Sequence, residues 1–161
     1  MLLAAITSYS ISVFIHVTAV VVGFGATFAE AVMFPVALKL DAKHLPYVHR
    51  LQLAINQRLA TPALVIVLIT GIYQVSEGDW SFGDFWISGT FAIVIAIGAL
   101  LGAYFIPSDR RLGPQVDRDL AETGAPSEEY LRQARRHGAF GGLTGLLLVI
   151  AIFLMVVKPG A

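Results

Sequence analysis

The chain has 161 residues, of which 57% are hydrophobic and 14% charged, and its formal net charge at pH 7 is zero. Soluble domains carry about a quarter charged residues, so this composition indicates an integral membrane protein. A neutral chain offers no basic surface to nucleic acid, which we therefore exclude as a partner. The absence of cysteine excludes disulfides, thiolate metal sites, iron–sulfur clusters and thiol catalysis.

Four apolar segments follow one another, and each is near or above the ~20 residues that cross a bilayer as a helix. These continuous runs lack the alternation of barrel strands. We therefore predict an all-α, four-helix transmembrane bundle that forms one domain over residues 1–161. The first helix lacks the features of a cleaved signal peptide, and we expect it to be retained. The predicted helices cover about residues 8–39, 46–77, 84–106 and 127–158.

The longest connection precedes the fourth helix. Residues 107–126 are polar and contain prolines and glycines, which interrupt helices, so we expect an exposed cytoplasmic loop there. Ser127 is the expected N-cap of the fourth helix, because two acidic residues follow it in the first turn.

Basic residues gather in the first and third connections, whereas the second connection carries only acidic charges. The positive-inside rule then places both termini outside, in a multi-pass protein of the bacterial cytoplasmic (inner) membrane. Helices 1, 2 and 4 are longer than their apolar spans, and we expect them to extend about 15 Å into the cytoplasm. This extension carries His44, His49 and Arg50, and the basic residues between 132 and 136.

The first helix carries ionisable residues inside its apolar span. His16, Val20, Gly23, Thr27 and Glu30 recur at helical spacing and form one stripe, which we expect to face the bundle interior. The stripe is about 21 Å long, so its two ionisable residues cannot share one small site. His16 belongs to the outer half of the membrane and Glu30 to the cytoplasmic half.

Glu30 needs a partner or a proton, because a charge inside the bilayer costs several kcal/mol. We expect it in a buried polar network with side chains that aligned spans bring to a similar depth, namely Thr27, Gln57, Arg58 and His137. Two interpretations stay open. The network is a polar clamp that fixes helix register, or it is a proton or ligand site.

His16 has no evident partner at its depth. A neutral imidazole there can serve as a structural donor, or it can bind a metal ion or the iron of heme b. An alternative heme b site lies on the cytoplasmic side, between His49 and His137, where basic residues including Arg58 would bind the propionates. We identify no catalytic residue.

Two stretches resemble a known group of proteins, "HVTAVVVGFGATF" from His16 and "TPALVIVLITGIY" with Thr70 and Gly71. They resemble small bacterial membrane proteins grouped with the copper-resistance D-type proteins, near the HemJ-type protoporphyrinogen oxidases, which bind heme b. The resemblance implies that His16 is an axial heme ligand. The third helix lacks the lysine of those oxidases, and Val36 replaces their arginine after the first-helix proline. The resemblance therefore implies a fold and a heme-type pocket without the oxidase activity.

Three functions are consistent with these features. The first is heme b binding in the bundle with a redox role. The second is a non-catalytic accessory or assembly subunit of a larger membrane complex. The third is a small proton- or cation-coupled transporter that uses Glu30. The lipid bilayer is an expected partner in each case, and a homo-oligomer or a larger membrane complex would supply further partners.

Overall fold

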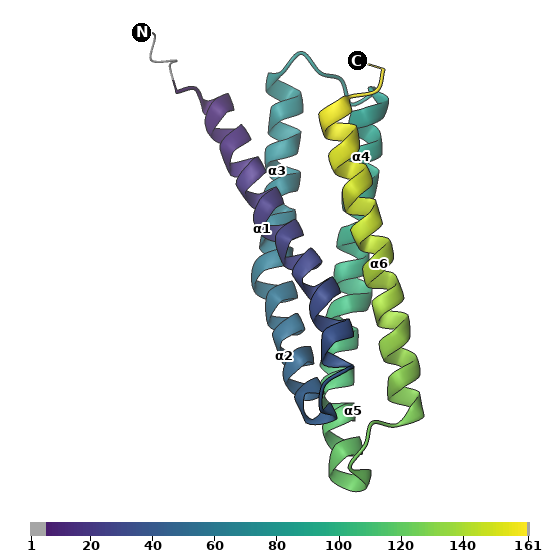
Figure 1. Ribbon diagram of the computed structural model, residues 1–161. Helices are drawn as coiled ribbons and strands as arrows, with labels where there is room; N and C mark the ends of the chain where they lie inside the picture. Colours follow the sequence, from purple (N-terminus) through teal and green to yellow (C-terminus); the bar gives the residue numbers. More distant parts are fainter. Residues whose placement is uncertain (1–5, 161) are drawn as a thin grey trace.

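The computed structural model describes residues 6–160, and this part of the chain is helical without any strand. It forms four rods, each long and apolar enough to cross a membrane (Figure 1). The predicted all-α, four-helix bundle is therefore confirmed. The elements are α1 (Ser8–Ala37), η1 (Ala42–His44), α2 (Leu45–Ile55), η2 (Asn56–Ala60), α3 (Thr61–Glu77), α4 (Phe85–Leu100), η3 (Leu101–Phe105), α5 (Ile106–Thr123) and α6 (Glu128–Val157).

The two ends of the bundle differ. α1 begins and α6 ends at one end, which we call the termini end (Figure 1). The opposite end holds α2, α5 and the start of α6, and we call it the basic end. Most of the arginines belong to these three elements.

Two π turns continue the second and third rods through a proline. Proline lacks an N–H group, and its ring clashes with the carbonyl four residues earlier. In η2 and η3 the chain bonds five residues back, because the N–H of Thr61 donates to Asn56 O and that of Ile106 donates to Leu101 O. The wider turn accommodates Pro62 and Pro107, so neither proline ends its rod.

The loop predicted over residues 107–126 is wrong for most of its length. α5 continues the third rod to Thr123, and it ends at Gly124, whose φ of 73° is left-handed. Gly113 of α5 packs against α2, and a Cβ on this glycine would lie 3.4 Å from His49 Cβ. The third rod therefore extends toward the basic end beside the others.

Ser127 is confirmed as the N-cap of α6, since its hydroxyl accepts from the Tyr130 N–H at 3.2 Å.

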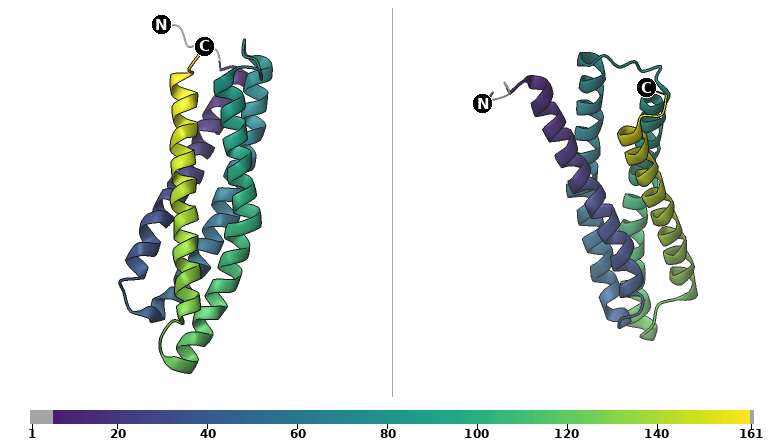
Figure 2. Two further views of the ribbon diagram at one scale, coloured as in Figure 1. Left: turned by 90° about the vertical axis from the view of Figure 1, so that its right-hand side faces the viewer. Right: turned by 45° about the horizontal axis from the view of Figure 1, so that its top comes forward.

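The helices of different rods pack in pairs, α1 with α3, α4 with α6, and α2 with α5 (Figures 1 and 2). Gly23 lets α1 approach α3 closely, because a Cβ on this glycine would lie 2.8 Å from Ala63 Cβ. Toward the termini end, α1 leans away from α6 (Figure 1). At the basic end the helices meet in an apolar core of Phe34, Ala37, Leu45, Val48, Leu112, Val116, Tyr130 and Ala134.

The outer surface of the bundle is strongly apolar. Large side chains such as Phe14, Val32, Ile69, Ile95 and Phe153 are more than half exposed. In water such a surface would be unstable, whereas lipid tails solvate it without cost. The exposed surface therefore agrees with four membrane-spanning rods.

Candidate functional site

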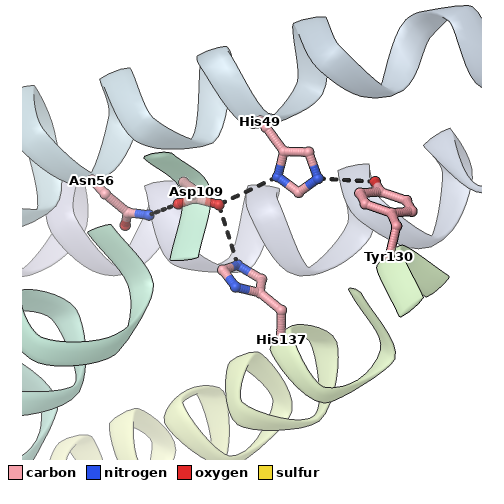
Figure 3. Close-up of polar contacts among 5 residues, drawn as sticks. All are labelled: His49, Asn56, Asp109, Tyr130 and His137. Atoms are coloured by element: carbon pink, nitrogen blue, oxygen red, sulfur yellow. Dashed lines mark hydrogen bonds and ion pairs between the residues drawn. The ribbon is translucent and has the colours of Figure 1, made fainter. Parts of the chain in front are cut away.

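A buried carboxylate joins three elements at the basic end. Asp109 of α5 lies between His49 of α2 and His137 of α6 (Figure 3). Its Oδ1 is 3.4 Å from His49 Nδ1 and 3.5 Å from His137 Nε2. The side chains of Asp109 and His49 have no solvent exposure, and that of His137 is 5% exposed. A buried carboxylate needs such partners, because an isolated one is too costly to bury.

The contacts continue on both sides of this carboxylate. Asn56 Nδ2 donates to Asp109 Oδ2 at 3.2 Å, and His49 Nε2 lies 2.9 Å from the Tyr130 hydroxyl (Figure 3). The tautomer of His49 with the proton on Nδ1 donates to Asp109 and accepts from Tyr130. We call these five residues (His49, Asn56, Asp109, Tyr130 and His137) the Asp109 cluster. It ties α2, η2, α5 and α6 together, and of the predicted network it contains only His137.

The structure separates the members of the predicted network. His137 is buried and belongs to the Asp109 cluster. Gln57 and Arg58 are exposed on η2, whose inward face is formed by Asn56 and Ala60, so neither lies in a buried network. The Thr27 hydroxyl is bound locally, to Gly23 O at 3.2 Å.

A central cavity lies between Glu30 and the Asp109 cluster. Its volume is about 180 Å³, and Glu30, Gln52, Asn56 and His137 supply its polar lining, together with Thr27 and Thr144. Three of these residues have a buried polar atom without a hydrogen-bond partner among residues 6–160, namely Glu30 Oε1, Gln52 Oε1 and His137 Nδ1. Glu30 therefore lacks the basic partner that the sequence predicted for it.

His16 has a partner that sequence reasoning missed. Its Nδ1 lies 2.8 Å from Thr70 Oγ1, and this hydroxyl lies 2.6 Å from Ile66 O. Because the hydroxyl donates its single proton to the Ile66 carbonyl, His16 Nδ1 must be the donor to Thr70. The lone pair of the imidazole is therefore on Nε2. No sequence signal pointed to Thr70, because this contact depends on the packing of α1 against α3.

His16 lines a second and larger cavity toward the termini end. This termini-side cavity has a volume of about 410 Å³ and a mostly apolar lining that includes Phe91 and Trp86. Gly71 lies beside the imidazole, and a Cβ on it would be 3.6 Å from His16 Cε1. Two groups that complement an anion also line the cavity, the Lys158 ammonium and the Trp86 indole. Trp86 Nε1 is buried and has no hydrogen-bond partner among residues 6–160.

The predicted metal role of His16 gains no support from its surroundings. Among residues 6–160, no group of three or more His, Asp or Glu side chains is placed to hold a metal ion. The Asp109 cluster is included in that statement. Both ring nitrogens of His49 face a carboxylate and a phenol, as in a hydrogen-bonded network.

Four spanning rods around a buried polar core define a multi-pass integral membrane protein. A family model described as predicted integral membrane protein (DUF2269) matches residues 10–159, so the chain belongs to this family. No curated protein and no solved structure matches the chain significantly. The resemblance to copper-resistance D-type and HemJ-type proteins stays a prediction.

Proposed function

We propose that the protein binds heme b in the termini-side cavity, with His16 as the axial ligand. The observation that carries this proposal is the bond between His16 Nδ1 and Thr70 Oγ1, 2.8 Å long. Histidines that bind metals usually donate their other ring nitrogen to an acceptor, which fixes the tautomer and raises the basicity of the ligating nitrogen. Thr70 is that acceptor here, and Nε2 is the nitrogen left for iron.

The size and lining of the cavity support the same proposal. Cofactor pockets typically measure about 300–1,000 Å³ and are mostly apolar, and the termini-side cavity, at about 410 Å³, falls in this range. Gly71 leaves room beside the imidazole. The Lys158 ammonium and the unpaired Trp86 N–H would hold the propionates. Bound heme supplies one-electron redox chemistry, with its potential set by the axial ligand and the apolar surroundings.

The alternative heme site on the basic side fits the residues poorly. His49 uses both ring nitrogens within the Asp109 cluster, and His137 Nε2 faces Asp109. The adjoining central cavity, at about 180 Å³, is smaller than typical cofactor pockets. Arg58 is exposed and lines neither cavity. The proposal therefore assigns the propionate-binding role to Lys158 instead of Arg58.

The proposal includes a redox role in the bacterial cytoplasmic membrane, with both termini outside. The distribution of arginines toward the basic end supports this orientation. The roles as accessory subunit or transporter, and an assembly with other chains, stay predictions.

The optical spectrum tests the proposal directly. Purified protein, titrated with hemin in detergent, should develop a saturable Soret band that sharpens on reduction. His16→Ala should lose this band, whereas His44→Ala should keep it, because His44 is an exposed histidine of η1 outside the cavity. Thr70→Val keeps the side-chain shape but removes the acceptor, and it should weaken heme binding about 10–100-fold.

Two results would contradict the proposal. One is a wild-type protein without a saturable Soret band. The other is an unchanged titration in His16→Ala. Thr144→Val is the matched control for Thr70→Val, since Thr144 is also a buried threonine whose hydroxyl donates to a carbonyl four residues earlier. It should leave the titration unchanged.

A further inference from the structure

We propose that the central cavity is a binding site for a small protonated amine, of the size of ammonium or methylammonium. Glu30, Gln52 and His137 would accept its hydrogen bonds. This site is separate from the proposed heme site, because these three residues do not line the termini-side cavity.

The lining of the central cavity contains buried hydrogen-bond acceptors that lack donors. Glu30 Oε1 and Gln52 Oε1 are buried acceptors without donors among residues 6–160. His137 Nε2 lies 3.5 Å from Asp109 Oδ1, and the tautomer with its proton on Nε2, toward this carboxylate, leaves the unpaired Nδ1 as an acceptor as well. Gln52 and His137 are 3% and 4% exposed, so bulk water does not satisfy them. A ligand that supplies several N–H donors would satisfy all three groups.

The charged groups around the central cavity favour a positively charged ligand. The described residues that line the cavity include Glu30 and no lysine or arginine. Behind the cavity lies the Asp109 carboxylate, whose described partners are two histidines and an asparagine. A carboxyl group at this depth requires a proton or a cation, because a bare carboxylate is too costly to bury. A protonated amine brings the charge and the donors together.

The size and the exposed lining residues of the central cavity suit a small ligand. A volume of about 180 Å³ is several times the ~30 Å³ share of a water molecule, and it suits a ligand of a few heavy atoms. Phenylalanines 24, 34 and 105 form part of the wall, and aromatic rings attract organic cations. Four lining residues are exposed, Ala31 and Pro35 on α1 and Gly138 and Gly142 on α6, and we expect the mouth of the cavity between these two helices.

Local backbone geometry is also unusual at this cavity. Both π turns contribute to its wall, η2 through Asn56 and Ala60 and η3 through Leu101 and Phe105. Such turns are rare within helices and are frequently found at functional sites.

A metal ion is a poor alternative occupant, since no group of three His, Asp or Glu side chains in residues 6–160 is placed to hold one.

Calorimetric titration of the purified full-length protein tests this site. Methylammonium chloride should bind saturably, whereas potassium chloride at the same ionic strength should bind much more weakly, because only two of the three unpaired acceptors are oxygens that coordinate a potassium ion. Glu30→Gln should weaken methylammonium binding about ten-fold or more, which corresponds to about 1.4 kcal/mol. Glu122→Gln is the matched control, since Glu122 is exposed on α5, and it should leave binding unchanged.

A second variant keeps the test valid if Glu30→Gln fails to fold. Gly142→Leu should obstruct the expected cavity mouth, and its Cβ would meet no described residue within 4 Å. Gly102→Leu is its control, since Gly102 is equally open but does not line the cavity. Absence of saturable methylammonium binding would mean that water alone fills the cavity. That result, an equal response to potassium, or unchanged binding in both Glu30→Gln and Gly142→Leu would overturn the proposal.

Discussion

Asp109 is the residue on which the polar interior at the basic end depends. It faces His49, Asn56 and His137, which come from three different elements, and its side chain is fully buried. Removing a carboxylate of this kind leaves several buried donors without an acceptor. The cost of each is about 1–3 kcal/mol, although the costs do not add fully.

We therefore predict that Asp109→Ala lowers the free energy of unfolding by about 3–5 kcal/mol. Chemical denaturation of the detergent-solubilised protein measures this change. Asp117→Ala is the control on the same helix, because Asp117 pairs with Arg50 at 3.1 Å on an exposed surface. It should cost less than about 1 kcal/mol. Similar losses in the two variants would show that the buried contacts do not stabilise the fold.

Sequence reasoning placed some of these residues and missed others. The predicted stripe on the first helix contains His16 and Glu30, and these residues line two cavities at opposite depths. The stripe was predictable because helical periodicity alone determines which side chains share a face. Asp109 and Thr70 were missed because their roles depend on contacts with other helices. Arg58 was misplaced because the depth of a residue does not determine its direction around the helix.

At the scale of elements, two glycines of α1 have opposite surroundings. A Cβ at Gly23 would lie 2.8 Å from Ala63 Cβ, whereas a Cβ at Gly25 would meet no described residue within 4 Å. We predict that Gly23→Ala destabilises the protein by about 1–3 kcal/mol, because α1 and α3 must move apart. Gly25→Ala should stabilise it by up to about 1 kcal/mol, since alanine favours helix. Unfolding of both variants under the same conditions would check the difference, and equal effects would contradict close packing at Gly23.

Residues 107–126 show that composition alone can wrongly predict a loop where the chain forms a helix. Proline and glycine suggested a loop, but Pro107 stands in the first turn of α5 and Pro114 is tolerated inside it. The better signal was the spacing of the residues that become buried, Ser108, Asp109, Leu112, Gly113 and Val116, which fall on one helical face. Three of these five are polar or glycine, so an apolar pattern search does not find them.

At the scale of the whole molecule, the orientation in the membrane remains a prediction that labelling can test. The chain contains no cysteine, so each introduced cysteine is the only reactive thiol. We predict that Ser81→Cys, in the exposed connection near the termini end, reacts with a membrane-impermeant maleimide in intact cells. Glu122→Cys, at the exposed basic end, should react only after permeabilisation. The reverse pattern would contradict the positive-inside assignment.

The π turns have a consequence for how the chain tolerates changes in length. A π turn contains one residue more than the α-helical turn it replaces, and each residue of an α-helix advances the helical face by about 100°. Deleting one residue from η3 would restore regular pitch with α5 still facing the same way, whereas regular pitch with every residue kept would rotate α5 by roughly that angle relative to α4. Asp109 would then face away from His49 and His137. The alignment of the buried carboxylate with its two imidazoles thus depends on the π turn that accommodates one additional residue in Leu101–Phe105, a segment that itself forms no part of the cluster.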